Sequence, residues 1–335
     1  WFGTFTGAAV VFFAYIGFDA VSTVAEETKN PAKDLPVGII ASLIICTILY
    51  VLVAGVFTGM VPWETVRGWT AAQRGESLTM ALETVAPQAL WQNTVIAFGS
   101  VVAHTAVLLV FQLGQPRIFF SMARDGLLPS VFASVHPRFK TPHVTTILTG
   151  VAVGGIAAFA TVDEMVSLTN IGTLFAFILV CVGVMVLRHK DPGRHRPFRV
   201  PLGPYLLPGL GAISCALLIY FLPEGSYWRF VGWLMLGLAV YMSYGYTRSA
   251  VGQKMGRPKL TPVGLKFAAV CFILVAVGLF VIPHDVAPRE LFSEAFDTSA
   301  EQHNQTLYGL LIIIFGLVGA AVGIVVGTRR EVGTE

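Results

Sequence analysis

Long apolar blocks separated by short polar segments dominate the pattern of this 335-residue chain. Most blocks are close to the ~20 residues that an α-helix needs to cross the hydrocarbon core of a bilayer. The pattern therefore predicts an all-α membrane protein whose nine membrane-spanning helices lie at 5–24, 37–61, 88–114, 144–161, 165–187, 205–222, 228–246, 264–282 and 307–327. The connecting segments are short except for 62–87, 115–143 and 283–306.

The first block is interrupted by polar and flexible positions. Gly17 and Asp19 lie within a stretch of aromatic and aliphatic residues. Glycine weakens a helix interior by about 1 kcal/mol relative to alanine, and an ionisable group at membrane depth costs more unless it faces protein or water. We therefore predict a broken helix between Tyr15 and Asp19, in which the carbonyls of Phe13, Ala14 and Ile16 lose their helical partners.

Such a break would give the first span a binding function. Carbonyls freed near the membrane midplane hold polar solutes in transporters, and the negative end of a half-helix favours a cation such as a substrate ammonium group. The alternative is a continuous helix in which Gly17 only permits close packing against a neighbouring helix.

Composition and charge support a membrane protein and assign its sides. Hydrophobic residues make up 55% of the chain and charged residues only 12%, whereas a soluble domain is about one quarter charged. The 22 Lys and Arg residues gather in one set of loops, except for Arg67, Arg74, Arg229 and Arg289. Because basic loops stay on the cytoplasmic side, the carboxy terminus is predicted to be cytoplasmic and the amino terminus outside.

An outside amino terminus without an initiator methionine suggests that an upstream segment with an odd number of spans is missing. The net charge of +3 is explained by cytoplasmic loops that lie against anionic membrane lipid, so no nucleic-acid partner is predicted.

The sharpest change in composition is a basic, proline-rich stretch at 188–205. It predicts a division into a five-span region at 1–187, which carries the broken helix and half of the substrate site, a cytoplasmic linker at 188–205, and a four-span region at 206–335. The last region has few polar side chains within its spans, which favours a role in contacting lipid or another copy.

Three motifs resemble those of one transporter family. They are FFAYIGFDAVSTVAEETKNPAKDLP at 12–36, GQPRIFFSMARDGLLP at 114–129, and the stretch from PFRVPL at 197–202 through YWRFVGW at 227–233 to YGY at 244–246. These motifs resemble the cationic amino acid transporters of the amino acid-polyamine-organocation superfamily. The resemblance implies spans six to fourteen of a fourteen-span protein, hence the second of two inverted five-helix repeats, with the amino-terminal half of the same protein as an absent partner.

The resemblance also implies which residues bind substrate. It places the α-amino group of an amino acid at the backbone of Phe13, Ala14, Tyr15, Ile16 and Gly17, with the Phe13 ring as a gate. Asp19 is expected either to cap the second half-helix alone or, as the resemblance implies, to cap it and also pair with a lysine on the absent fifth span, whose protonation couples transport to a proton gradient.

His104 lies deep within the third predicted span, where a histidine invites a functional interpretation. By resemblance it lines the substrate pocket and tunes which substrate fits. The alternative is a neutral imidazole bonded to a neighbouring carbonyl. No metal site is predicted, because zinc needs three or four ligands and the same span supplies no second histidine or carboxylate.

Charged residues at the cytoplasmic ends of the first and third spans suggest a gate. Arg124 and Asp125 could pair with the charges that follow the first span, among them Glu26. Exposed ion pairs of about 0 to 1 kcal/mol suit a contact that must open in each cycle. The alternative is that Gly126 and Pro129 only end the preceding helix.

Together these observations predict a secondary amino acid transporter of the plasma membrane. It would import an amino acid with protons by alternating access and need no cofactor. Sodium coupling stays open, and neutral substrates are as compatible as cationic ones. No phosphate-binding loop of the GxxxxGK[ST] type occurs in the sequence. Two alternatives are a non-transporting membrane scaffold or sensor and a membrane-embedded enzyme that uses His104 and Asp19 as an acid/base pair.

Overall fold

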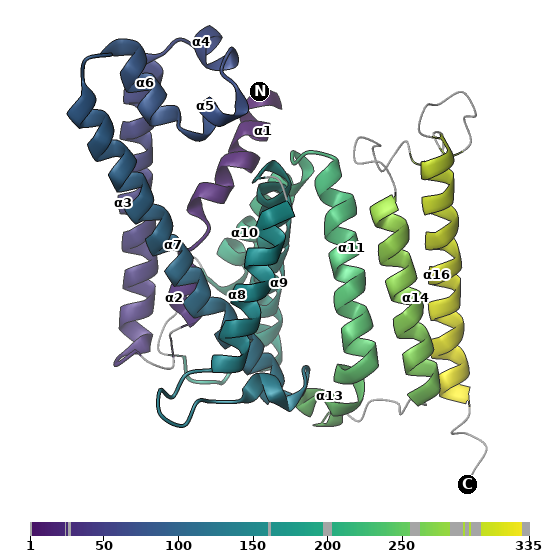
Figure 1. The fold of residues 1–335 in the computed structure, drawn as a ribbon. Coiled ribbons are helices and arrows are strands. Elements are labelled where there is room, and N and C mark those ends of the chain that lie inside the picture. The colour runs from purple at the N-terminus through teal and green to yellow at the C-terminus, as the bar shows by residue number, and fades with distance from the viewer. Residues whose placement is uncertain are drawn as a thin grey trace. The chain divides into compact units, whose positions relative to one another are not determined.

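The computed structural model describes residues 2–23, 25, 28–159, 162–196, 203–254, 262–281, 291, 295 and 303–329. Within them, helices are the only regular secondary structure, which confirms the predicted all-α class (Figure 1). The chain forms two compact units. One is Gly17–Gln115, and the other combines Trp1–Ile16 with Pro116–Glu335.

Each predicted span contains a helix. The helices are α1 (Phe2–Val11) with α2 (Ala20–Thr23), α3 (Pro31–Met60), α7 (Leu90–Arg124), α8 (His143–Phe159), α9 (Val162–Lys190), α10 (Gly203–Tyr220), α11 (Gly225–Val240), α14 (Pro262–Val281) and α16 (His303–Arg329). Among the described residues, seven helical segments are long and apolar enough to cross a membrane. The two predicted spans outside that set are α8, which has 17 residues, and α11, which has 16.

α11 does not end at Val240 as a free terminus. A π-helix at Tyr241–Gly245 and a short helix α12 (Tyr246–Arg248) continue it without a break in the chain's helical course. The π-turn inserts an extra residue per turn and is a frequent feature of functional or strained sites. The predicted span at 228–246 thus corresponds to this composite helix.

α3 and α7 extend furthest beyond their predicted bounds, and a proline lies in each extension. α3 begins at Pro31 rather than at 37, because proline is well tolerated in the first turn of a helix. α7 continues through Pro116 to Arg124 rather than ending at 114. A proline inside a membrane helix removes one backbone hydrogen bond without ending the helix when neighbouring groups satisfy the freed carbonyl.

The segment at 62–87 folds as three short helices, α4 (Trp63–Arg67), α5 (Ala71–Gly75) and α6 (Ser77–Val85). α5 begins with a capping box, in which Thr70 and Gln73 each bond the other's backbone amide. Trp69 is only 8% exposed and packs edge-on against Phe57 of α3, with Ala81 of α6 in the same cluster. This connecting segment is therefore helical and is packed onto the end of α3.

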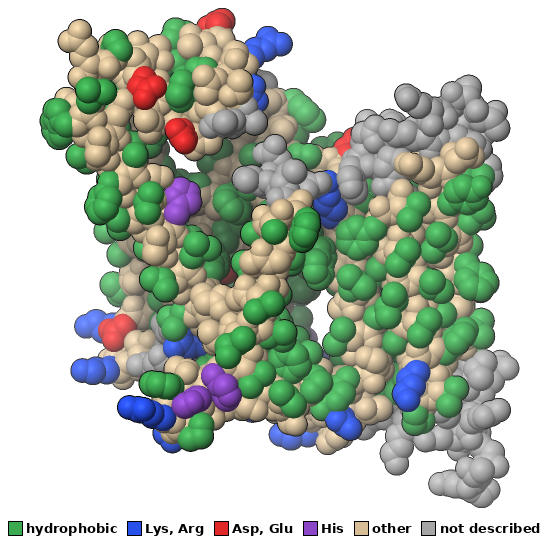
Figure 2. All heavy atoms as spheres, viewed as in Figure 1, with side chains coloured by type: hydrophobic (Ala, Val, Ile, Leu, Met, Phe, Trp, Pro, Cys, Tyr) green, Lys and Arg blue, Asp and Glu red, His purple; other side chains and the backbone are tan. Residues whose placement is uncertain are grey.

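In the other unit, successive helices pack side by side. α9 contacts α10 and α11, α11 contacts α14, and α14 runs along α16 (Figure 1). Trp228 of α11, Val275 and Leu279 of α14, and Leu310 of α16 form one buried cluster. On the face seen in Figure 2, hydrophobic side chains cover most of the length of α14 and α16, as expected of helices in contact with lipid.

Small residues allow α14 and α16 to approach closely. A Cβ atom added to Gly316 would lie 2.7 Å from Val275 Cγ2 and 2.8 Å from the Cys271 carbonyl oxygen. Gly278 has the same relation to the backbone of Gly309, at 2.8 Å. Membrane helices gain little from the hydrophobic effect between them, so close backbone packing of this kind is a main source of their association.

This packing generates a test. Gly316→Ala is expected to lower the free energy of unfolding by roughly 1–3 kcal/mol, because the added methyl group forces two backbones apart. Gly237→Ala in α11 is the matched control, since nothing lies within 4 Å of the position of its added Cβ. Thermal unfolding in detergent measures both. Equal melting temperatures for the two variants would contradict the assigned contact.

Candidate functional site

The first span is broken where the sequence predicts. α1 ends at Val11, a 3₁₀-helix η1 covers Phe12–Tyr15, and Ile16 is extended with ψ of 128°. Gly17 follows with φ of +129°, a conformation that side chains other than hydrogen rarely allow, before α2 resumes at Ala20. The continuous-helix alternative is therefore wrong for this segment.

The hydrogen bonds around the break correct one expectation. The Phe13 carbonyl is not left open, because the amide of Ile16 donates to it at 3.2 Å. The change from α to 3₁₀ spacing moves the donor from the fourth to the third following residue, so the bond is replaced rather than lost. Among the described residues, no hydrogen bond reaches the carbonyl of Ile16, which makes it the best-placed backbone acceptor of the break.

Asp19 stabilises the break itself. Its Oδ1 accepts a hydrogen bond from the amide of Gly17 at 3.2 Å. The first turn of α2 instead uses the Asp19 backbone carbonyl, which accepts from the Ser22 amide at 2.9 Å and from the Ser22 hydroxyl at 2.6 Å. The carboxylate thus bonds the glycine before it, whereas a conventional cap bonds an amide within the following helix. Its predicted coupling role stays a prediction.

Sequence reasoning missed Asn170, a polar residue inside the apolar block of α9. It is fully buried, and its Nδ2 donates to the carbonyls of Ala9 and Val10 at 3.2 Å each. These carbonyls belong to the last turn of α1, directly before the break. An asparagine within a predicted span was the available signal, because a buried amide side chain needs partners.

His104 lies on α7 in the compact unit Gly17–Gln115, and its side chain is exposed there. Its Nδ1 is 2.7 Å from the Ser100 carbonyl oxygen and 3.3 Å from the Ser100 hydroxyl. Because a carbonyl oxygen only accepts, Nδ1 carries a proton, and Nε2 of a neutral ring is left as an acceptor. This is the contact of the simpler alternative, while the pocket-lining role stays a prediction.

The predicted cytoplasmic gate is described in part. Glu26 lies outside the described residues, so its part in the gate stays a prediction. Arg124 and Asp125 are exposed at the end of α7. The amide of Leu127 bonds the Met122 carbonyl at 2.9 Å and the amide of Gly126 bonds the Ala123 carbonyl at 3.1 Å. With Gly126 at φ of +79°, this is a Schellman motif, so the predicted helix termination is confirmed.

The same turn contacts the carboxy-terminal helices. The Asp125 carbonyl accepts a hydrogen bond from the amide of Ala250 at 3.1 Å. A Cβ on Gly126 would collide with the Arg248 carbonyl, so only glycine fits both the backbone angle and the space. The turn that carries Arg124 and Asp125 is thus fixed to the end of the composite helix α11 to α12.

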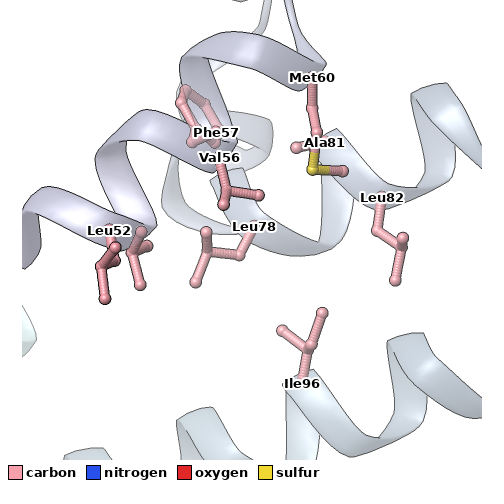
Figure 3. Close-up of a pocket in the computed structure, with 9 residues that line it drawn as sticks. Leu52, Val56, Phe57, Met60, Leu78, Ala81, Leu82 and Ile96 are labelled. Carbon is pink, nitrogen blue, oxygen red and sulfur yellow. The ribbon is translucent and has the colours of Figure 1, made fainter. Parts of the chain in front are cut away.

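An apolar cavity of about 350 Å³ lies between α3, α6 and α7 (Figure 3). Its lining is Leu52, Val53, Val56, Phe57, Met60, Leu78, Ala81, Leu82 and Ile96. An amino acid carries two charged groups, and burying them among these side chains would cost several kcal/mol without partners. The cavity is therefore unsuited to that substrate. Nor do the described residues bring three His, Cys, Asp or Glu side chains together as a metal ion would require.

Comparison with known protein families shows which family this chain belongs to. The sequence profile of the amino acid permease family matches residues 1–244. The chain belongs to the amino acid permease family. The matched region contains the broken span, α7 with His104 and α9 with Asn170, so the candidate site lies entirely on the permease portion of the chain.

Individual relatives include bacterial and plant permeases. The branched-chain amino acid permease BcaP of Bacillus subtilis is 44% identical over 251 residues, which are 75% of this chain and 52% of that protein. The methylthioribose transporter of the same bacterium is 42% identical with the same coverage. The vacuolar cationic amino acid transporter 4 of Arabidopsis thaliana is 43% identical over 190 residues, 57% of this chain and 30% of that protein.

These relatives, which are named as permeases or transporters, confirm the resemblance to the cationic amino acid transporters. The chain spans about half the length of the Bacillus proteins and less of the plant protein. With its long apolar helices, this permease is a multi-pass membrane protein.

The backbone of the break generates a second test. Gly17→Ala is expected to lower the free energy of unfolding by roughly 1–2 kcal/mol, because φ of +129° is strained for any residue with a Cβ atom. Gly7→Ala, in the helical part of the same span with nothing within 4 Å of the added Cβ, is expected to be neutral or slightly stabilising. Thermal unfolding compares them, and a neutral Gly17→Ala variant would rule out the positive φ.

Proposed function

We propose that this permease is part of a secondary active transporter of amino acids, and that the break in its first span binds the α-ammonium group of the substrate. The observation that carries the proposal is the Ile16 carbonyl, which lies at an extended residue between two helical segments and receives no hydrogen bond from the described residues. A peptide oxygen in that state is a strong acceptor for a charged N–H donor.

The electrostatics of the break favour the same guest. α1 and η1 end here, so the negative end of their aligned peptide dipoles, about half an elementary charge, points toward the break. A cationic ammonium group is stabilised by that field, whereas a carboxylate is not. The substrate carboxylate would then need donors from elsewhere, which fits the resemblance's implication that the amino-terminal half of the protein supplies the rest of the site.

The proposal includes coupling to protons through Asp19 and alternating access. Asp19 is two residues from Gly17 and already shares a hydrogen bond with its amide, so a change in charge at the carboxylate would act directly on the break. The distribution of Lys and Arg supports a cytoplasmic carboxy terminus, and residence in the plasma membrane completes the proposal. In this scheme Arg124 and Asp125 belong to the cytoplasmic gate.

A second candidate substrate follows from one comparison. The methylthioribose transporter is nearly as similar to this chain as the branched-chain permease, over the same number of residues. Methylthioribose is a sugar without an ammonium group, and its hydroxyl groups are also donors to a free carbonyl. A neutral hydroxylated substrate is therefore the alternative guest for the same break.

Uptake into vesicles tests the transport proposal. The protein that contains this sequence is reconstituted, and uptake of labelled arginine, alanine, leucine and methylthioribose is measured with and without an inward proton gradient. We expect saturable uptake of at least one amino acid, increased by the gradient and abolished by a protonophore. Absence of uptake for all three amino acids would reject the proposal, and uptake of methylthioribose alone would select the second candidate.

Competition by blocked amino acids tests the ammonium contact. The N-acetyl derivative of the transported amino acid keeps its side chain and carboxylate but has no charge on nitrogen. It is expected to compete at least tenfold more weakly than the free amino acid, because a charge-assisted hydrogen bond is worth about 1.5–3 kcal/mol. Equal competition would show that the break does not bind the ammonium group.

His104→Ser is expected to widen tolerance for larger substrate side chains if position 104 lines the pocket. The readout is the ratio of inhibition by large and small amino acids in the uptake assay. Thr105→Val is the matched control. Thr105 is also exposed on α7 and its hydroxyl donates to the Val101 carbonyl, but as the next residue along the helix it lies on a different face from His104. Equal selectivity in wild type and His104→Ser would remove the pocket assignment.

A further inference from the structure

The contact between α9 and the end of α1 carries an inference beyond the proposed function. We propose that Asn170 is a positioning residue that keeps the first span broken, by donating both of its side-chain N–H groups to the last carbonyls of α1. Its effect on substrate affinity rests on the proposed function, whereas its effect on the backbone of the break does not.

The bonding requirement at the break is set by helix geometry. The last carbonyls of an α-helix have no intrahelical amide, and a following 3₁₀-helix pairs its amides with carbonyls only three residues earlier. Ala9 and Val10 are in the last turn of α1, directly before η1. The primary amide of Asn170 reaches both of their carbonyls at 3.2 Å. One side chain therefore replaces two backbone amides.

Burial makes these two bonds important. Asn170 and Ala9 are both completely buried, so water is not available to the Ala9 carbonyl in place of the amide, whereas the bond to the Val10 carbonyl is partly buried. The orientation of the amide is also determined. Turning it over would place its oxygen against two carbonyl oxygens, which cannot donate.

The other end of the amide argues against a packing role. Asn170 Oδ1 is buried and, among the described residues, has no hydrogen-bond partner. A buried acceptor without a partner lowers stability, and an apolar side chain of the same size would avoid this. The amide is thus unfavourable at this position except for what its two N–H groups do, which is to hold the end of α1.

Apolar contacts on the same side of α9 hold the segment laterally but do not satisfy its backbone. Ala9, Ile171 and Leu174 share one buried cluster, and Phe12 packs edge-on against Phe177 with ring centroids 6.2 Å apart. These contacts are compatible with either a broken or a continuous helix. Only the bonds from Asn170 discriminate, because in a continuous helix the amides of Phe13 and Ala14 would take the same two carbonyls.

The test replaces the amide without changing its size. In Asn170→Leu the carbonyls of Ala9 and Val10 lose both side-chain donors, so the end of α1 is held less firmly and the hydrogen bonds of η1 and the break open more often. Amide hydrogen exchange of residues 12–19, measured by mass spectrometry on the protein in lipid nanodiscs, is expected to become at least about fivefold faster, since two hydrogen bonds of ordinary strength are lost. Exchange in α14 and α16 is expected to stay unchanged.

Two control variants separate positioning from general stability. Leu174→Ala creates a cavity in the same cluster and lowers the melting temperature, but it is expected to leave exchange of residues 12–19 within about twofold of wild type, because the bonds from Asn170 persist. Thr169→Val removes an exposed hydroxyl that bonds only the Met165 carbonyl and is expected to change neither quantity. If Asn170→Leu behaves like Leu174→Ala, with a lower melting temperature and unchanged exchange at the break, the inference is wrong.

Transport measurements connect the backbone effect to function. Asn170→Leu is expected to raise KM for the transported amino acid at least about fivefold, while Leu174→Ala leaves KM within about twofold for the folded fraction. If the wild-type protein transports no amino acid, the proposed function fails, but the exchange comparison still decides the role of Asn170. Unchanged KM together with accelerated exchange would keep the structural role and overturn its effect on affinity.

Discussion

A peptide group within a membrane has no water to bond, and this constraint shapes the first span of the permease. An open helix is tolerated only where side chains or altered backbone spacing replace the lost hydrogen bonds. Here the replacement comes from three directions. Asn170 takes the last carbonyls of α1, the 3₁₀ spacing of η1 returns the Phe13 carbonyl to the Ile16 amide, and the Asp19 carboxylate takes the Gly17 amide. Among the described residues, the Ile16 carbonyl is the acceptor of the break that receives no such replacement.

Helices of the unit that combines Trp1–Ile16 with Pro116–Glu335 hold the first helix of the broken span in place. α9 is the central element, because it packs against α10 and α11 and also supplies Asn170 and Phe177 to the broken span. The entry to the span is fixed as well, since Phe2 and Phe5 both pack on Phe221 after α10, with ring centroids 5.2 and 5.0 Å apart. The first helix of the span is thus held by aromatic contacts at its start and by Asn170 at its end.

The position of the break could be predicted from the sequence, whereas its hydrogen bonds could not. The break was predictable because Gly17 and Asp19 are each costly within a span, and both kinds of cost point to the same place. The detail of its hydrogen bonds was not predictable, because an α-helix and a 3₁₀-helix differ by one residue in spacing and no residue type marks the change. Asn170 was missed because its partners lie 160 and 161 positions away in the chain, a separation that periodicity does not reveal.

Helix ends also combine features that local sequence predicts with features that depend on distant contacts. Gly126 and the termination of α7 were predictable, since a glycine followed by a proline three residues later is a local signal. That the turn also contacts Arg248 and Ala250 depends on the packing of a distant π-helix and could not be predicted. The extension of α7 through Pro116 was underestimated because proline in a soluble helix usually ends it, whereas membrane helices are more tolerant.

The backbone arrangement at the break does not by itself determine the substrate, as two relatives illustrate. Two transporters with 44% and 42% identity to this chain are named for a branched-chain amino acid and for methylthioribose. A peptide carbonyl accepts from ammonium and hydroxyl donors alike, so a break in the backbone selects for donors and not for a chemical class. Selection must then come from side chains around the break and from the field of the helix ends. The helix dipole favours an ammonium ion over a neutral hydroxyl group, and this difference is the physical basis for proposing an amino acid as the substrate.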